Sequence, residues 1–117
     1  MSRDDHAALL DILQAARFAL EFRATLDEGA FLLDRKTQSA ILHQLLILGE
    51  ATKRLSDSFR TRHPDVPWRL MAGMRDTLIH TYDAVDLEEV WRTIAVDLPR
   101  LLPALEAIVP RDPAPPA

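Results

Sequence analysis

Apolar residues recur every three or four positions through most of this chain, and this spacing restricts its fold more than any other feature. From Asp4 or Asp5 to about Arg23 they form one face of an amphipathic helix. A second helix is predicted from an N-cap at Asp34 to about Phe59, with an apolar face wide enough to be covered on more than one side. No segment alternates as a half-buried strand does. We therefore expect an all-α fold, an antiparallel bundle of four or five helices.

Glycine and proline mark the boundaries between the predicted helices. The stretch around Gly29 is predicted to be a loop. Pro64 and Pro67 disfavour helix in the residues before them, and Pro67 suits the first turn of a helix. The third helix should therefore begin there and continue to about His80.

The fourth helix has a clear start and an interrupted course. Asp86 is the predicted N-cap, because Glu89 follows it by three residues as in a capping box. Pro99 and Pro103 each remove a backbone donor, so this helix should kink or restart near Asp97, whose side chain could cap the restart.

Composition predicts one small domain with a disordered end. The chain has 117 residues, of which 48% are hydrophobic, enough for a single core. The absence of cysteine excludes disulfides, cysteine zinc sites and thiol chemistry. Residues 1–109 are expected to form the helical domain, and residues 110–117, rich in Pro and Ala, to be disordered. No apolar run reaches the roughly 18 residues of a membrane span, so we expect a cytoplasmic protein that needs no membrane.

The charge of the chain is distributed unevenly. Its net charge is −4, yet residues 51–75 contain six basic and two acidic residues. Such a cationic segment could bind the phosphates of a nucleic acid, with Lys53 and Arg54 as candidate RNA-binding residues. It could equally be an ordinary solvated surface.

Three reactive side chains, Arg75, His80 and Tyr82, lie within eight residues at the end of the predicted third helix. On a helix, Arg75 and His80 would be about 140° apart around the axis and roughly 7.5 Å apart along it, so one helix cannot aim both at one atom. His80 would share a face with the small residue Gly73 and with Asp76. Two copies of this face could meet across a two-fold axis and form one cleft.

Asp76 and Glu50 could each assist this cleft or only stabilise a helix. Asp76 is four residues before His80 and could accept a hydrogen bond that fixes the tautomer of the imidazole, or it could be a solvated acid. Glu50 could pair locally with Arg54 or extend across the bundle towards Arg75.

The pattern Arg75-x4-His80-x-Tyr82 resembles the signature of HepT-like proteins, a branch of the HEPN superfamily. The surrounding residues strengthen the likeness, because Gly49-Glu50-Ala51 resembles the family's "GEA" helix. Pro67-Trp68 before the motif and the segment from Val85 to Trp91 after it also match, and the resemblance covers about residues 5–109. The sequence departs from the family at Asp76, where an asparagine is more common.

The resemblance implies a homodimer that cleaves RNA at a composite site without a metal ion or other cofactor, with Arg75 and His80 as catalytic residues. It further implies a toxin of a type VII toxin-antitoxin pair. Its partner would be a minimal nucleotidyltransferase antitoxin that neutralises it by transferring AMP to Tyr82.

Two other functions compete with this interpretation. His80, Asp83, Asp86, Glu88 and Glu89 form a run of possible metal ligands. The acids at 86, 88 and 89 are explained by the positive end of the fourth helix, however, so we expect no metal site. The second alternative is a non-catalytic helical subunit that binds a nucleotidyltransferase or a nucleotide.

Overall fold

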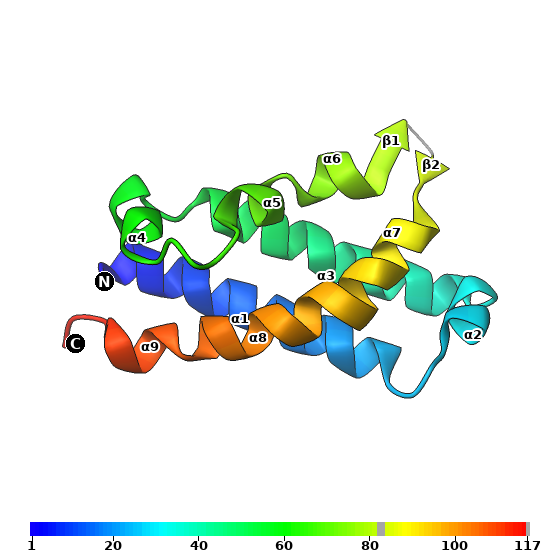
Figure 1. The fold of residues 1–117 in the computed structure, drawn as a ribbon, viewed down its shortest axis with the longest axis horizontal. Coiled ribbons are helices and arrows are strands. Elements are labelled where there is room, and N and C mark those ends of the chain that lie inside the picture. Colours follow the sequence, from blue (N-terminus) through cyan, green and yellow to red (C-terminus); the bar gives the residue numbers. More distant parts are fainter. Residues whose placement is uncertain (82–83, 117) are drawn as a thin grey trace.

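Two antiparallel helices, α1 and α3, run side by side through most of the molecule's length (Figure 1). The computed structural model describes residues 1–81 and 84–116. In this part of the chain the elements are α1 (Arg3–Arg23), α2 (Glu28–Leu32), α3 (Arg35–Lys53), α4 (Asp57–Arg62), α5 (Trp68–Ala72), α6 (Met74–Leu78), β1 (Ile79–Thr81), β2 (Ala84–Val85), α7 (Leu87–Arg92), the π-helix η1 (Thr93–Asp97), α8 (Leu98–Glu106) and α9 (Ile108–Arg111).

Shorter helices cover this central pair from two sides. Helices α5 and α6 pack on α3, and α8 packs on α1. The apolar positions predicted for the first helix are in the core, where Leu9, Ile12 and Ala16 are fully buried. The predicted all-α class is confirmed, with one two-stranded antiparallel hairpin as the exception. None of the helices described is long and apolar enough to cross a membrane.

The region around Gly29, predicted as a loop, contains the short helix α2. The Asp27 side chain caps this helix by accepting a hydrogen bond from the Ala30 N–H at 2.9 Å. Phe31 is fully buried, and its ring lies 5.4 Å from that of Trp91 on α7. Burial of one aromatic ring thus stabilises a helix that is too short to form alone.

The second long helix starts as predicted but ends earlier. The Asp34 side chain accepts from the Thr37 N–H at 3.0 Å, which confirms Asp34 as the N-cap of α3. The prediction that this helix continues to Phe59 is wrong, because α3 ends at Lys53 and Ser56 caps a separate helix, α4.

Asp5, a buried residue of α1, stabilises the chain where it passes from α3 to α4. Its carboxylate accepts hydrogen bonds from the Ser56 N–H at 2.8 Å and from the Ser56 hydroxyl at 2.7 Å. Burial alone would raise the pKa of Asp5, but the hydrogen bonds from Ser56 and Ser2 outweigh it and the pKa lies below its ordinary value. The carboxylate therefore stays charged at neutral pH and fixes the position of α4.

The third predicted helix, from Pro67 to His80, is also wrong in its second half. It is interrupted at Gly73 between α5 and α6, and α6 ends at Leu78. The chain then extends into β1, whose residue Ile79 is opposite Val85 of β2. His80 is therefore on a strand and shares no helical face with Gly73 or Asp76.

The fourth helix begins at the predicted cap and changes form before its prolines. The Asp86 side chain accepts from the Glu89 N–H at 3.1 Å. Residues Thr93–Asp97 then form a π-helical turn, which accommodates Pro99 in the first turn of α8. Asp97 makes no side-chain capping bond, so its predicted capping role is wrong.

The end of the chain is attached to the bundle through Asp112 and through the carbonyl of Pro113, which accepts a hydrogen bond from the amino group of Met1 at 2.9 Å. Helix α9 ends at Arg111, and the Asp112 carboxylate accepts hydrogen bonds from Arg62 and His63 on the α4 side. Disorder of residues 110–117 stays a prediction, although α9 continues to Arg111.

Gly49 allows α3 to approach α5 and α6 closely. A Cβ atom at this position would lie 3.1 Å from the carbonyl oxygen of Met71 and 3.2 Å from the Cβ of Met74. At Gly29, by contrast, an added Cβ would meet only the Asp27 side chain at 3.6 Å, an ordinary contact.

We predict that Gly49→Ala lowers the free energy of unfolding by about 1–2 kcal/mol, because the new methyl group is forced against backbone. The matched variant Gly29→Ala should be neutral or stabilising by up to about 1 kcal/mol, since alanine favours helix. Urea denaturation followed by circular dichroism measures both. Equal stabilisation by the two substitutions would contradict the close approach at Gly49.

Candidate active site

His80 is carried on the outer face of the β hairpin. Its neighbour Ile79 is half-buried and packs against the core, whereas the side chain of His80 is 57% exposed. This difference follows from the alternation of side chains along a strand. The hairpin therefore presents the imidazole to solvent above a buried apolar contact.

Asp86 holds the imidazole of His80. Nε2 of His80 lies 2.9 Å from one carboxylate oxygen of Asp86, and the other oxygen accepts from the Glu89 N–H at the start of α7. The hydrogen bond from His80 and then that from Glu89 lower the pKa of Asp86 below its ordinary value. The carboxylate is therefore ionised at neutral pH.

This contact determines which nitrogen of His80 is available for chemistry. An ionised carboxylate can only accept hydrogen bonds, so Nε2 must carry the hydrogen. In the neutral ring Nδ1 is then the unprotonated nitrogen and can accept a proton. The geometry therefore supports a histidine that is oriented for acid-base catalysis.

Arg75 lies on the exposed side of α6. Its neighbours Met74 and Leu78 are buried and anchor this short helix to the core. Within residues 1–81 and 84–116, no ion pair joins Arg75 to an acid. No acid in this part of the chain neutralises its guanidinium, which can therefore bind an anion. Arg75 and His80 do not share one helix as predicted, because α6 ends between them at Leu78.

Asp76 does not hold His80 in this arrangement. It is exposed on α6, and no hydrogen bond or ion pair between the described residues joins it to the imidazole. The sequence pattern indicates Asp86 as a helix cap and a possible metal ligand, but not as the partner of His80, because it places His80 on a helix. The β-forming residues Ile79, Thr81 and Val85 were the signal for a hairpin that would bring the two together.

Tyr82 and Asp83 lie outside the described residues, so the proposed modification site stays a prediction. The helix that carries Arg75, α6, ends at Leu78 and so does not continue to Tyr82.

The basic segment is largely neutralised in the folded chain. Lys53 pairs with Glu50, and Arg54 pairs with Asp11 on α1. Glu50 was expected to pair with Arg54 or Arg75, but its partner is Lys53. The other pairs in the segment are Arg60 with Asp57 and Arg62 with Asp112. RNA binding by Lys53 and Arg54 thus has to compete with carboxylates, although exposed pairs are weak.

Comparison with known proteins identifies the family of this chain. Residues 12–108 match the family described as "Ribonuclease HepT-like". The chain belongs to this family. It is 43% identical over 101 residues to the "Probable ribonuclease HepT" of Thermococcus cleftensis, a match that covers 86% of this chain and 92% of the relative. A "Putative RNase" of Methanocaldococcus jannaschii is 34% identical over 106 residues, covering 91% of this chain and 97% of the relative. No solved structure is significantly similar.

Membership in this family supports an enzyme that cleaves RNA. Arg75 is exposed and His80 is hydrogen-bonded to Asp86, so these two residues are the candidates for its active site. Among the described residues, no three His, Asp or Glu side chains gather as metal ligands do.

We predict that Asp86→Asn reverses the tautomer of His80. The amide oxygen can still accept from the Glu89 N–H, since asparagine is also a good N-cap, but the amide NH₂ then faces Nε2 and donates to it. The hydrogen would move to Nδ1, and RNA cleavage should fall about tenfold or more. Nitrogen-15 NMR of the imidazole and a cleavage assay measure these effects.

Asp34→Asn is the matched control, because Asp34 caps α3 in the same way without touching a histidine. It should leave both the tautomer and the cleavage rate unchanged. An unaltered His80 tautomer in Asp86→Asn would show that Asp86 does not orient the ring.

Proposed function

We propose that this ribonuclease is the toxin of a type VII toxin-antitoxin pair and cleaves RNA at a composite site between two copies of the chain, without a metal ion. One observation carries the catalytic part of this proposal: a solvent-exposed imidazole is held at 2.9 Å by an ionised carboxylate, close in sequence to an exposed arginine.

The reaction needs three contributions from the protein. A base removes the proton from a 2′-hydroxyl, whose oxygen attacks the adjacent phosphorus. An acid gives a proton to the 5′-oxygen as its bond to phosphorus breaks, which leaves a 2′,3′-cyclic phosphate and a free 5′-hydroxyl. Positive charge stabilises the phosphorane between these steps. His80 can perform the proton transfers, and Arg75 can supply the charge.

The need for both an acid and a base favours two copies of the site. One chain offers a single histidine in this motif, whereas a two-fold dimer offers two. RNA bound across the axis would make the two imidazoles inequivalent, so that one is neutral and the other protonated. The homodimer is thus part of the mechanism.

We predict that Arg75→Ala and His80→Ala each lower cleavage of a mixed-sequence RNA by on the order of 10²–10³ or more in excess chelator. Both side chains are exposed, so helicity and dimer mass should not change. Arg60→Ala is the matched control. This arginine of the basic segment already pairs with Asp57, and its loss should weaken cleavage only slightly, more at low salt.

Cleavage at the parental rate by either motif variant would refute this catalytic assignment. A monomer by light scattering at micromolar concentration would refute the composite site. If the parent protein binds a nucleotidyltransferase or nucleotide but never cleaves RNA, the chain is instead a non-catalytic helical subunit.

Control by a minimal nucleotidyltransferase would act at Tyr82. Its phenol oxygen would attack the α-phosphorus of ATP, and pyrophosphate would leave, so that AMP becomes bound through a phosphodiester. Tyr82 follows His80 by two residues. The added phosphate would compete with RNA for Arg75, and the adenosine would obstruct the RNA path.

We predict that incubation with ATP, magnesium and the partner nucleotidyltransferase adds the mass of AMP to the peptide containing Tyr82 and stops cleavage. An active Tyr82→Phe variant should escape this inhibition. Mass spectrometry and a cleavage assay measure the two effects. Complete inhibition of an active Tyr82→Phe protein, with no AMP on Tyr82 in the parent, would show that control does not act through this tyrosine.

A further inference from the structure

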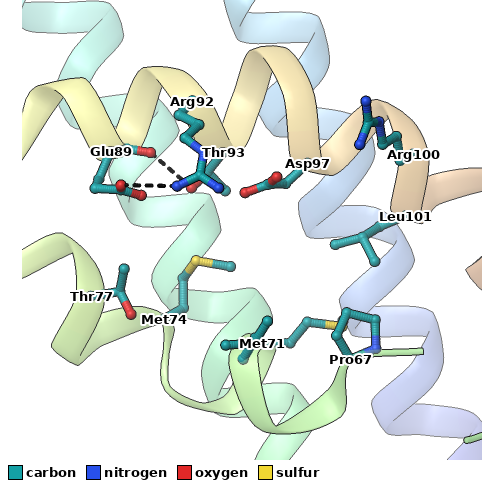
Figure 2. Close-up of a pocket in the computed structure, with 11 residues that line it drawn as sticks. Pro67, Met71, Met74, Thr77, Glu89, Arg92, Thr93, Asp97, Arg100 and Leu101 are labelled. Carbon is teal, nitrogen blue, oxygen red and sulfur yellow. Dashed lines mark hydrogen bonds and ion pairs between the residues drawn. The ribbon is translucent and has the colours of Figure 1, made fainter. Parts of the chain in front are cut away.

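A groove of about 320 Å³ lies beside α6, the helix that carries Arg75. It lies between α5 and α6 on one side and α7, η1 and α8 on the other (Figure 2). The groove exists because α5 and α6 pack on α3 while α8 packs on α1. Its volume is at the lower end of the range for sites that bind small ligands.

The floor of the groove is apolar and suited to a flat ring. Met71 and Met74 line it, and Figure 2 shows the Met74 side chain extending between the two helices. Thioether sulfurs make favourable contacts with aromatic rings, and methionine adapts its shape to the ligand. At the edge, Leu70 is 73% exposed, which is unusual for so large an apolar side chain.

The opposite wall provides a hydrogen-bond acceptor and a donor. Asp97 and Arg100 both line the groove, one at the end of the π-helical turn and the other on α8. Asp97 makes no capping bond, and neither side chain is bonded to another residue within the ranges 1–81 and 84–116. Arg92, by contrast, is already bonded to Glu89 at 3.3 Å. π-Helical turns are frequent at functional sites.

The groove adjoins the candidate active site through shared elements. Thr77, which lines it, is two residues after Arg75 on α6. Glu89, which also lines it, donates its backbone N–H to Asp86, the residue that holds His80. Arg75 and Thr77 are two residues apart on α6 and therefore lie on different sides of this helix. A strand of RNA bound at Arg75 and His80 would cross α6 to place a neighbouring nucleotide in this opening.

We propose that the groove binds one nucleobase of the RNA substrate, a guanine beside the cleaved phosphodiester. This inference rests on the proposed ribonuclease function. The ring would lie against Met71 and Met74. The carboxylate of Asp97 can accept from N1–H and the N2 amino group, and the guanidinium of Arg100 can donate to O6 and N7. Guanine fits best because it places two donors side by side and two acceptors side by side.

Binding can be measured without cleavage by NMR of methionine methyl groups. The chain has three methionines, of which Met71 and Met74 line the groove and Met1 does not. Adding guanosine monophosphate should shift the methyl signals of Met71 and Met74 and leave Met1 unchanged. Cytidine and uridine monophosphates should shift them less, and inorganic phosphate should have no effect.

Arg100→Ala should raise the dissociation constant of guanosine monophosphate about tenfold or more, since it removes the bidentate contact to the base. Arg111→Ala is the matched control, because Arg111 is exposed on α9 and bonds to the Ala107 carbonyl outside the groove. Absent shifts, or equal binding by the two variants, would overturn the base site. Shifts that grow with protein concentration alone would show instead that a second chain fills the groove.

Mapping of cut positions separates this inference from the proposed function. The parent protein should cut next to guanine, Asp97→Ala and Arg100→Ala should lose that preference, and Arg111→Ala should keep it. If the parent protein and the Asp97→Ala and Arg100→Ala variants all cut RNA with the same base preference, the base site is overturned and the ribonuclease proposal is unaffected. A parent protein that shows the methyl shifts but never cleaves RNA would overturn the ribonuclease proposal and leave the nucleotide site standing.

Discussion

Close packing of α3 against its neighbours is the constraint on which the rest of the structure depends. On one side, small residues of α1 such as Ala8, Ala15 and Ala19 are fully or almost fully buried, and α1 and α3 form the most extensive helix pair. On the other side, Gly49 lets α3 approach the backbone of α5. Helices α5 and α6 are each too short to be stable alone, so they take their position from this contact. Arg75 is placed by α6, and therefore indirectly by Gly49.

The second constraint is electrostatic and acts at the point where α6 ends. The chain leaves the helix at Leu78, turns back as a hairpin, and enters α7 through the Asp86 cap. The backbone N–H of Asp86 donates to the Leu78 carbonyl at 2.8 Å, which closes the segment. One carboxylate then stabilises the start of α7 and orients His80. Structure and candidate chemistry thus depend on the same residue.

The sequence was sufficient for features that depend on near neighbours. The start of α3 at Asp34, the start of α7 at Asp86 and the core face of α1 each follow from residues three or four positions apart. The sequence was insufficient where a distant residue decides. The break after Lys53 depends on Asp5, which is 51 positions from Ser56.

The candidate site shows the same division. Arg75 and His80 could be selected from their spacing and surroundings, because a motif is a local pattern. Their geometry could not, because helical periodicity continues through Met74 and Leu78 and does not reveal that the helix ends there. Asp76 was the predicted partner of His80, but the hairpin brings Asp86 to the imidazole instead. The cationic segment was misleading for a related reason, since the acids that neutralise it include Asp11 and Asp112 from distant parts of the chain.

That neutralisation bears on how an acidic protein can act on a polyanion. The folded chain has a net charge of −4, and four of the six basic residues between positions 51 and 75 are paired with carboxylates. The two that remain without an acid among the described residues are Arg69 and Arg75, on the two consecutive helices α5 and α6. Acidic surface elsewhere repels RNA, so bound phosphate is favoured where these two guanidinium groups are. A low overall charge therefore does not weaken the case for RNA cleavage, because it confines attraction to the helices that carry the candidate site.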